Sequence, residues 1–277
     1  MLELPECHAA AIQLTKTVGG KEVDRAVAAR SKHGFAWYSA APEEYSANLK
    51  GLTVEGAREV AAYVELMLSG GMLLAFRDGI NLRFLNPGEK VPDKHQLLIG
   101  FSDGSHLVCT VQMYGGMWMF KDGEKNDRYY LAARENPTPL EEGFDYGYFK
   151  AICERENGSL SVKALLATEQ RIPGLGNGTL QDILFNARIN PQSRLFRLDE
   201  GDVRRLYEAV RQTLASMAEG GGRNTEKDLF GNYGGYECVL SNRTAKNPCP
   251  VCGGSITKKS YLGGSVYYCE NCQPVLK

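Results

Sequence analysis

Two cysteine pairs near the end of the chain decide how this region folds. Cys249-Pro-Val-Cys252 is followed, after sixteen residues, by Cys269-Glu-Asn-Cys272. Four thiolates in paired C-x2-C turns form the ligand set of a structural zinc site, so we expect these four cysteines to bind one Zn²⁺. A segment this short buries little apolar surface, and metal binding would supply its folding free energy. The alternative is a pair of disulfides or four free thiols.

The start of the chain and its overall charge narrow the class of protein. The first ten residues, MLELPECHAA, contain neither a basic region nor a long apolar run, so we expect a cytoplasmic protein without a secretory signal. No stretch of eighteen apolar residues occurs, and we expect no membrane span. A formal net charge of −1 excludes a globally basic nucleic-acid binder but permits a basic face.

The first half of the chain has the pattern of a helix followed by strands. Pro5 suits the first turn of a helix over residues 5–17, and Gly19-Gly20 ends it. From there to about residue 135, apolar runs separated by tight turns predict antiparallel strands. Residues 62–76 form a hairpin pattern, and the Asp-Gly pairs at 78–79 and 103–104 predict two more turns. We therefore expect an antiparallel β-sandwich with flanking helices.

The second half of the chain is helical. Residues 134–145 contain two prolines and four acidic residues, which is the composition of a linker. Residues 203–217 then carry apolar side chains along one face of a helix. The prediction is an α+β protein with a β-sandwich domain (1–135), a hinge linker (136–145), a helical domain (146–245) and a zinc finger (246–277).

A glycine-rich turn lies between two of the predicted helices. Gly174-Leu175-Gly176-Asn177 is followed by a helical stretch that stops at Pro191. A turn of this kind exposes backbone N–H groups that can bind a phosphate. The alternative is a plain connection between helices.

Four features in one order give a much more specific signal. They are Leu2-Glu3-Leu4-Pro5-Glu6 at the start, the Gly174–Asn177 turn, Gly222-Arg-Asn-Thr225 within a GGRNT stretch, and the four cysteines. Over essentially its whole length the chain resembles the formamidopyrimidine-DNA glycosylase and endonuclease VIII family of base-excision repair enzymes. The resemblance implies a β-sandwich hinged to a helix-two-turn-helix domain that carries a four-cysteine zinc hairpin.

The resemblance also implies a particular chemistry. Family members flip a damaged nucleotide out of the duplex, and an N-terminal proline amine attacks C1′ of that nucleoside. The glutamate beside the proline handles protons on the sugar. A lysine on an N-terminal hairpin, an arginine at the finger tip and the asparagine of the glycine turn bind phosphates around the lesion.

Position by position, this chain departs from that pattern. Leu2 takes the place of the proline nucleophile, while Glu3 is present. Gly71 stands where the hairpin lysine is expected, and Gly264 where the finger arginine is expected. Asn177 is kept.

The remaining candidate site residues follow from the resemblance and, for the basic residues, from the near-neutral charge, which confines DNA binding to one face. The free amine would belong to Met1; the alternatives are a lysine elsewhere as the nucleophile, or a water activated by Glu3 without strand cleavage. Glu6 would lie in the first helical turn beneath the site, where a structural role is favoured over a catalytic one. We expect DNA contacts from the turn and from a basic face, with Met113 or Tyr114 as a wedge in the vacated base space; these residues are Gly176, Asn177, Arg188, Lys258, Lys259, Met113 and Tyr114. Trp37 is expected in the core of the sandwich, with a base-stacking platform as the alternative. Beyond Gly222, the resemblance places a mobile loop near the lesion, which includes Arg223.

Two main functions remain open at this point, beside a weaker third class, a zinc-hairpin protein that binds RNA or protein. The first is a DNA glycosylase that acts on double-stranded DNA with a damaged base or an abasic site, with AP-lyase activity through an N-terminal amine. The second is a non-catalytic lesion- or structure-specific DNA-binding protein that keeps the scaffold. In either case we expect a monomer associated with nucleoid DNA. The sequence does not name the lesion.

Overall fold

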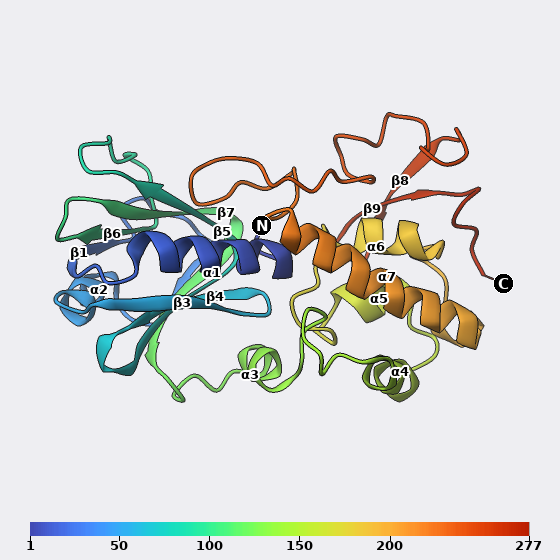
Figure 1. Ribbon diagram of the computed structural model, residues 1–277, viewed down its shortest axis with the longest axis horizontal. Coiled ribbons are helices and arrows are strands. Elements are labelled where there is room, and N and C mark those ends of the chain that lie inside the picture. Colours follow the sequence, from blue (N-terminus) through green and yellow to red (C-terminus); the bar gives the residue numbers. More distant parts are fainter. Residues whose placement is uncertain (277) are drawn as a thin grey trace.

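The computed structural model describes residues 1–276, and most of its strands gather at one end of an elongated molecule, while most of its helices and a two-stranded hairpin lie at the other (Figure 1). The N-terminus lies in the middle, between the two groups. Residue 277, the last of the predicted zinc finger, lies outside the described residues. Among the helices of residues 1–276, none has both the length and the apolar character needed to cross a bilayer.

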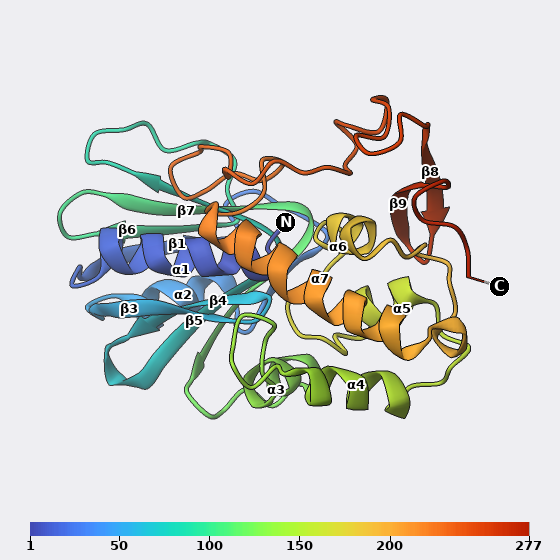
Figure 2. The same cartoon turned by 45° about the vertical axis from the view of Figure 1, so that its right-hand side comes forward.

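Strands β1 to β7 form one seven-stranded sheet. Its order is β1-β6-β7-β5-β4-β3, all antiparallel, and the short β2 pairs in parallel with β7. The strands are β1 (Val23–Ala28), β2 (Ala36–Tyr38), β3 (Val54–Val60), β4 (Tyr63–Leu68), β5 (Met72–Leu85), β6 (Leu97–Phe101) and β7 (His106–Lys121). The helices α1 (Leu4–Val18) and α2 (Pro42–Leu49) flank this sheet (Figures 1 and 2).

One of the predicted turns is wrong. Asp78-Gly79 does not end a strand, because β5 continues through it and the register with β7 shifts there. Asp78 has φ 64°, and Met113 on the facing strand has φ 68°. These irregularities divide the two long strands, whose halves enclose a shared core with α1. The turns at Ser69–Gly71 and at Ser102–Gly104 are confirmed, because antiparallel strands flank each of them.

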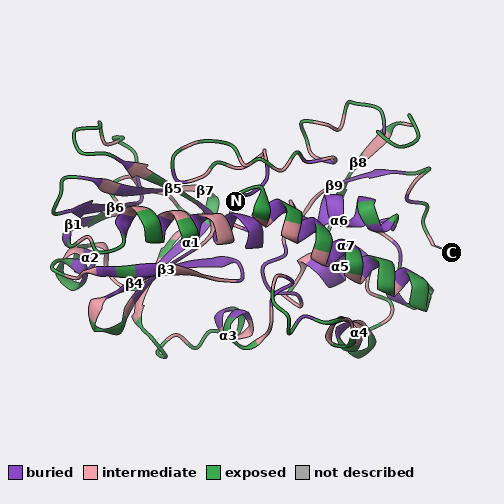
Figure 3. Ribbon diagram, in the orientation of Figure 1, coloured by how far each residue is buried: buried purple, intermediate pink, exposed green. Residues whose placement is uncertain are grey.

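The other half of the chain forms a bundle and a hairpin. The helices are α3 (Arg128–Glu135), α4 (Tyr146–Arg155), α5 (Val162–Ala167), α6 (Leu180–Ala187) and α7 (Glu200–Glu219), and the hairpin strands are β8 (Ile256–Tyr261) and β9 (Gly264–Cys269). α7 is the predicted amphipathic helix, and its Leu206, Val210 and Leu214 are buried (Figure 3). The predicted α+β class is therefore confirmed, whereas the boundaries at 135, 145 and 245 stay predictions.

The two large cores each take a residue from the other side of the molecule. Leu4, at the start of α1, packs among residues of the helical half such as Leu175 in the glycine turn and Leu180 in α6. Conversely, Leu229 follows α7 in sequence but is buried in the core of the sheet. Each buried leucine contributes roughly 1.5–3 kcal/mol. The start of the chain and the segment after α7 thus join the sheet to the helices.

Candidate active site and metal centre

Glu3 lies buried at the junction of the sheet and the helices. One carboxylate oxygen accepts a hydrogen bond from Gly178 N–H and the other from Thr179 N–H, each at 2.8 Å. These N–H groups open α6, whose own N-cap residue provides no side-chain bond, so Glu3 caps this helix from 175 residues away. Burial alone would raise the pKa of Glu3, but the charge of Arg223 and these hydrogen bonds lower the pKa overall. The carboxylate is therefore ionised near neutral pH.

The glycines of the turn make room for this contact. A Cβ atom on Gly176 would lie 2.5 Å from Cδ of Glu3, and one on Gly178 would lie 1.5 Å from Nη1 of Arg223. Gly174 has φ 89° and accepts a hydrogen bond on its carbonyl oxygen from Leu4 N–H. In this structure Gly176, predicted as a DNA contact, admits the carboxylate of Glu3.

Arg223 holds two buried carboxylates together. It donates from Nε and Nη2 to Glu6, at 2.9 and 2.7 Å, and its Nη1 lies 3.6 Å from Glu3. Its own backbone N–H also donates to Glu6. Because Arg223 is 2% exposed, it is a fixed part of the site and not a solvent-facing loop residue. Glu6 is thus bound by Arg223, and its role in the site stays a prediction.

The N-terminal nitrogen atoms lie on the sheet side of this junction. Leu2 N–H donates to the carbonyl oxygen of Asp78, at the bulge of β5, at 2.7 Å. This nitrogen is a peptide amide, so it has no free lone pair with which to attack a sugar. The α-amine of Met1 forms an ion pair with Glu226. A small cavity here is lined by Met1, Leu2, Glu6, Arg223 and Glu226, among others.

Met113 and Tyr114 project from the irregular part of β7. They are 65% and 38% exposed, and Tyr114 contacts the ring of Trp37, with ring centroids 5.8 Å apart. Trp37 is itself 43% exposed, so the expectation that it lies in the core is wrong. Gly79, on the facing strand, has no room for a side chain because a Cβ atom would lie 1.9 Å from the carbonyl oxygen of Gln112. The bulge thus directs an aromatic and thioether surface outward beside the N-terminus.

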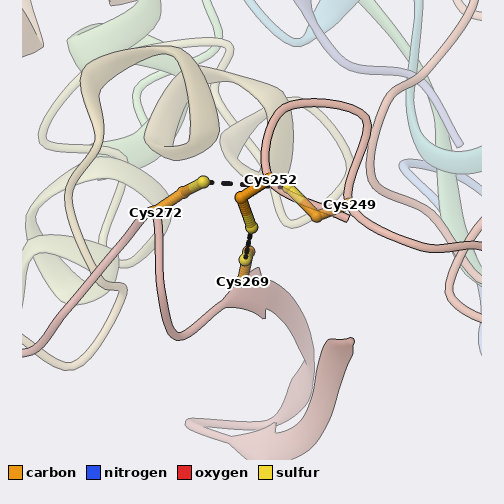
Figure 4. Close-up of side chains that lie close together, drawn as sticks. All are labelled: Cys249, Cys252, Cys269 and Cys272. Carbon is orange, nitrogen blue, oxygen red and sulfur yellow. Dashed lines mark hydrogen bonds between the residues drawn. The ribbon is translucent and has the colours of Figure 1, made fainter. Parts of the chain in front are cut away.

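The four cysteines converge as their spacing predicts. Their sulfur atoms all lie within 4.8 Å of one another (Figure 4). The Sγ atoms of Cys249 and Cys272 are 3.8 Å apart, and those of Cys252 and Cys269 are 3.4 Å apart. A disulfide needs about 2.05 Å, whereas four sulfurs at about 2.3 Å from a tetrahedral zinc ion lie roughly 3.8 Å from each other. The four cysteines fit a metal ion and not two disulfides.

The tip of the hairpin packs against the glycine turn. Asn177 donates from Nδ2 to the carbonyl oxygen of Ser265 at 2.9 Å. A Cβ atom on Gly264 would lie 2.9 Å from Oδ1 of Asn177, so this side chain fills space beside the tip. The buried amine of Lys163, on α5, donates to the carbonyl oxygens of Tyr261 and Leu262 in the same hairpin tip. Burial lowers the pKa of Lys163.

The predicted basic residues do not share one surface. Successive residues of a strand point to opposite sides, and Lys258 lies over the ring of Tyr267 while Lys259 donates to Gln192. Tyr267 lines a depression together with Asn177 and Arg243. Arg188 is exposed at the C-terminal end of α6, with φ 59°. Of the two lysines, Lys258 is therefore the one on the side of the glycine turn.

Comparison with known proteins shows the family to which this chain belongs. No family model matches the chain. A formamidopyrimidine-DNA glycosylase from Pelotomaculum thermopropionicum is 32% identical over 224 residues, which are 77% of this chain and 78% of the relative. The chain belongs to the formamidopyrimidine-DNA glycosylase family. A formamidopyrimidine-DNA glycosylase from Bacillus cereus is 27% identical over 99% of both chains.

Solved structures of formamidopyrimidine-DNA glycosylases share the fold. MutM (Fpg) from Thermus thermophilus matches with a TM-score of 0.79 and 24% identity over 99% of each chain. Fpg from Lactococcus lactis, in complex with DNA containing an abasic site, matches with a TM-score of 0.81 and 20% identity over 98% of this chain and 99% of that one.

Several partners of the site were not found from the sequence. Glu226, Gly178 and Thr179 are each more than 170 residues from the N-terminal residue that they contact. No local spacing connects such residues. The surplus of glycine in residues 174–178 was the one available signal, since it indicates that another part of the chain approaches closely.

Proposed function

We propose that the protein binds double-stranded DNA containing a damaged base or an abasic site and acts as a DNA glycosylase of base-excision repair. The junction at Glu3 carries this proposal. It joins the N-terminus, the glycine turn and Arg223 in one buried, charged contact beside an exposed aromatic surface. Membership of the glycosylase family and its match to a relative bound to abasic DNA support this function.

Glu3 would act through its negative charge. Its oxygens already accept backbone hydrogen bonds, and its pKa is lowered, so it is not a proton donor near neutral pH. An ionised carboxylate beside the sugar would stabilise the positive charge that develops on C1′ as the bond to the base breaks. Tyr114 or Met113 would enter the space left by the flipped nucleotide.

The Met1 amine is the candidate nucleophile for AP-lyase activity. Its nitrogen would attack C1′, and the bond from C1′ to the base would break with its electron pair leaving on the base. Opening of the sugar ring would then give an iminium ion, with O4′ taking a proton. Because Leu2 contributes only an amide, the reaction would be displaced by one residue along the chain.

One structural Zn²⁺, bound by Cys249, Cys252, Cys269 and Cys272, would hold the hairpin against the glycine turn. Its role would be folding, because four cysteine ligands leave no open position for substrate. Asn177, Arg188 and Lys258 would contact the DNA backbone. Such a protein would work at nucleoid DNA in the cytoplasm.

A second candidate function is lesion binding without catalysis. Three changed positions favour it, since Leu2, Gly71 and Gly264 lack the amine, ammonium and guanidinium groups that the family pattern places there. Gly71 has φ 73°, which disfavours a larger residue, although a side chain there would meet no atoms. The scaffold would then bind damaged DNA while leaving the base in place.

Base release and binding on the same oligonucleotides distinguish these functions. The panel contains an oxidised purine, an oxidised pyrimidine or an abasic site, and binding is measured at fixed salt because phosphate contacts are salt-dependent. A glycosylase releases a base and loses this activity in Glu3→Gln. Asp182→Asn is the matched control, because Asp182 is also a buried carboxylate that accepts two backbone hydrogen bonds at α6. Tight lesion binding with no base released would establish the second function and overturn the first.

A further inference from the structure

The segment after α7 crosses back to the sheet and reaches the N-terminal amine. We call residues 223–233 the strap. In both views it leaves the end of α7, passes beside the sheet and returns towards β8 (Figures 1 and 2). Its first residue, Arg223, is fixed by Glu6 on α1. It is therefore attached to the sheet side of the molecule from its beginning.

A second attachment lies six residues further along the strap. Leu229 is buried in the core of the sheet, its N–H donates to Oε1 of Gln13, and its carbonyl oxygen accepts from Phe84 N–H at 2.8 Å. Asp228 accepts a hydrogen bond from Nε2 of the same Gln13 at 3.0 Å. Only five residues, 224–228, lie between these two attachments.

Glu226 lies midway between the attachments, three residues from each. Its Oε2 accepts the hydrogen bond of the Met1 amine, and its backbone N–H donates to the carbonyl oxygen of Arg223 at 3.0 Å. The side chains of Met1 and Glu226 are 37% and 24% exposed, so the ion pair remains open to an entering group. The strap thus presents one carboxylate to the α-amine of Met1.

The other carboxylates around the amine are engaged elsewhere. Glu3 caps α6 and Glu6 binds Arg223, whereas the second oxygen of Glu226 has only a long contact of 3.4 Å with the hydroxyl of Thr225. The charged residues that line the cavity around Met1 are Glu6, Arg223, Glu226, Lys227 and Asp228. Among these carboxylates, Glu226 is the one in contact with the amine.

We propose that Glu226 is a catalytic residue that positions the Met1 amine and takes its proton during attack on C1′. This inference rests on the glycosylase function proposed above. The Met1 ammonium passes one proton to Glu226, and its freed electron pair forms the bond to C1′ as the base leaves. A second proton from the nitrogen goes to the departing base. The Glu226 carboxylic acid returns its proton to O4′ as the ring opens, which leaves an iminium ion and restores the carboxylate.

The test measures two rates on the same DNA. With protein in excess over a duplex containing an oxidised base, one assay follows base release and the other follows the adduct trapped by borohydride. Glu226→Gln should lower the rate of adduct formation about 100-fold near neutral pH. The rate should recover as the pH rises, because hydroxide then frees the amine without a carboxylate. Glu226→Asp should restore part of the rate at neutral pH.

Glu237→Gln is the matched control, since Glu237 is an exposed glutamate further along the same chain segment and should leave the rate unchanged. Unchanged or faster adduct formation in Glu226→Gln would overturn the proposal, because Glu226 would then only bind the N-terminus without taking part in the reaction. Base release by the natural chain without any adduct would also overturn it and leave the glycosylase function intact. If neither base release nor an adduct occurs, the glycosylase function fails as well.

Discussion

The two ends of the chain differ in how closely their residues match the family pattern. At the cysteine end every ligand is present, and the four sulfur atoms converge within 4.8 Å. At the amine end the nucleophile position is Leu2, whose nitrogen is a peptide amide bound to Asp78. The residues that build the zinc hairpin are thus all present, whereas the residue expected to react with the sugar is replaced. Residues that build the scaffold can therefore be considered separately from those that would react.

Glu3 belongs both to the residues that build the scaffold and to those proposed to act on the sugar. Its carboxylate caps α6 and faces Arg223, so the fold needs it whether or not a base is excised. The structural contacts of Glu3 would thus account for its presence beside Leu2 even without the catalytic role proposed above. Catalysis needs separate proof at the amine end.

The largest expected effect lies at the cysteine end. Cys269→Ser should abolish zinc binding, because it removes a buried ligand, and apparent zinc-binding energies of similar sites are about 10–16 kcal/mol. Zinc content by mass spectrometry and protease sensitivity of residues 246–276 provide the measurement. Cys153→Ser is the control, since Cys153 lies outside the cluster. An unchanged zinc content in Cys269→Ser would show that the finger folds in another way.

Arg223→Met should produce the next largest effect, at the junction. It leaves Glu3 and Glu6 buried without their shared cation, which should cost roughly 3–5 kcal/mol in the free energy of unfolding at neutral pH. The pKa of Glu3 is lowered in the folded protein, so its stabilising effect is present above the ordinary carboxyl pKa and is lost as the pH falls through the lowered value.

Urea unfolding at several pH values checks this prediction. The difference between Arg223→Met and the natural chain should shrink as the pH falls towards the lowered pKa of Glu3 in the natural chain, because burial favours protonation of a carboxylate that has lost its cation. Arg205→Met, which removes an arginine that is mostly exposed on α7, should change the stability far less. If the difference stays constant over this pH range, the charge of Glu3 does not contribute to the stability, and the prediction is wrong.

An arginine placed at the finger tip, where the family pattern has one, should lower the free energy of unfolding whether or not it contacts DNA. In Gly264→Arg the new Cβ atom would meet the amide of Asn177, with an expected loss of about 1–3 kcal/mol from overpacking. Asn177→Ala combined with Gly264→Arg should recover part of that loss. Thermal unfolding of the single and double variants measures the coupling, and purely additive effects would contradict the contact.

The smallest expected effect distinguishes two neighbouring lysines of the finger. Lys258 lies on the side of Tyr267 and the glycine turn, whereas Lys259 contacts Gln192. Lys258→Gln should therefore reduce the salt slope of DNA binding by about 0.9, the value for one lost phosphate contact, and Lys259→Gln should leave it unchanged. Equal slopes for the two variants would show that the hairpin faces DNA differently.

Local patterns predicted those parts of the structure whose contacts lie near each other in sequence. The spacing of Cys249, Cys252, Cys269 and Cys272 is one example, and the apolar face of α7 is another. Pro5 and Gly19 likewise predicted the limits of α1 to within one residue. In each case the residues that determine the structure lie within a few turns of one another.

The remaining features depend on contacts between distant parts of the chain. Asp78-Gly79 and Asp103-Gly104 have the same turn composition, yet only the second forms a turn. Met113 on the facing strand accommodates the first as a bulge. The ion pair between Met1 and Glu226 spans 225 residues, so neither neighbourhood indicates the other.

Identifying the nitrogen that becomes attached to the sugar tests the central claim most directly. After reaction with abasic DNA and borohydride, the protein is digested with trypsin and its peptides are examined by mass spectrometry. The amine chemistry that we propose predicts a reduced sugar on the α-nitrogen of Met1, within the peptide of residues 1–16. An adduct on a lysine, on a Leu2 amine exposed by loss of Met1, or on no residue at all would contradict it.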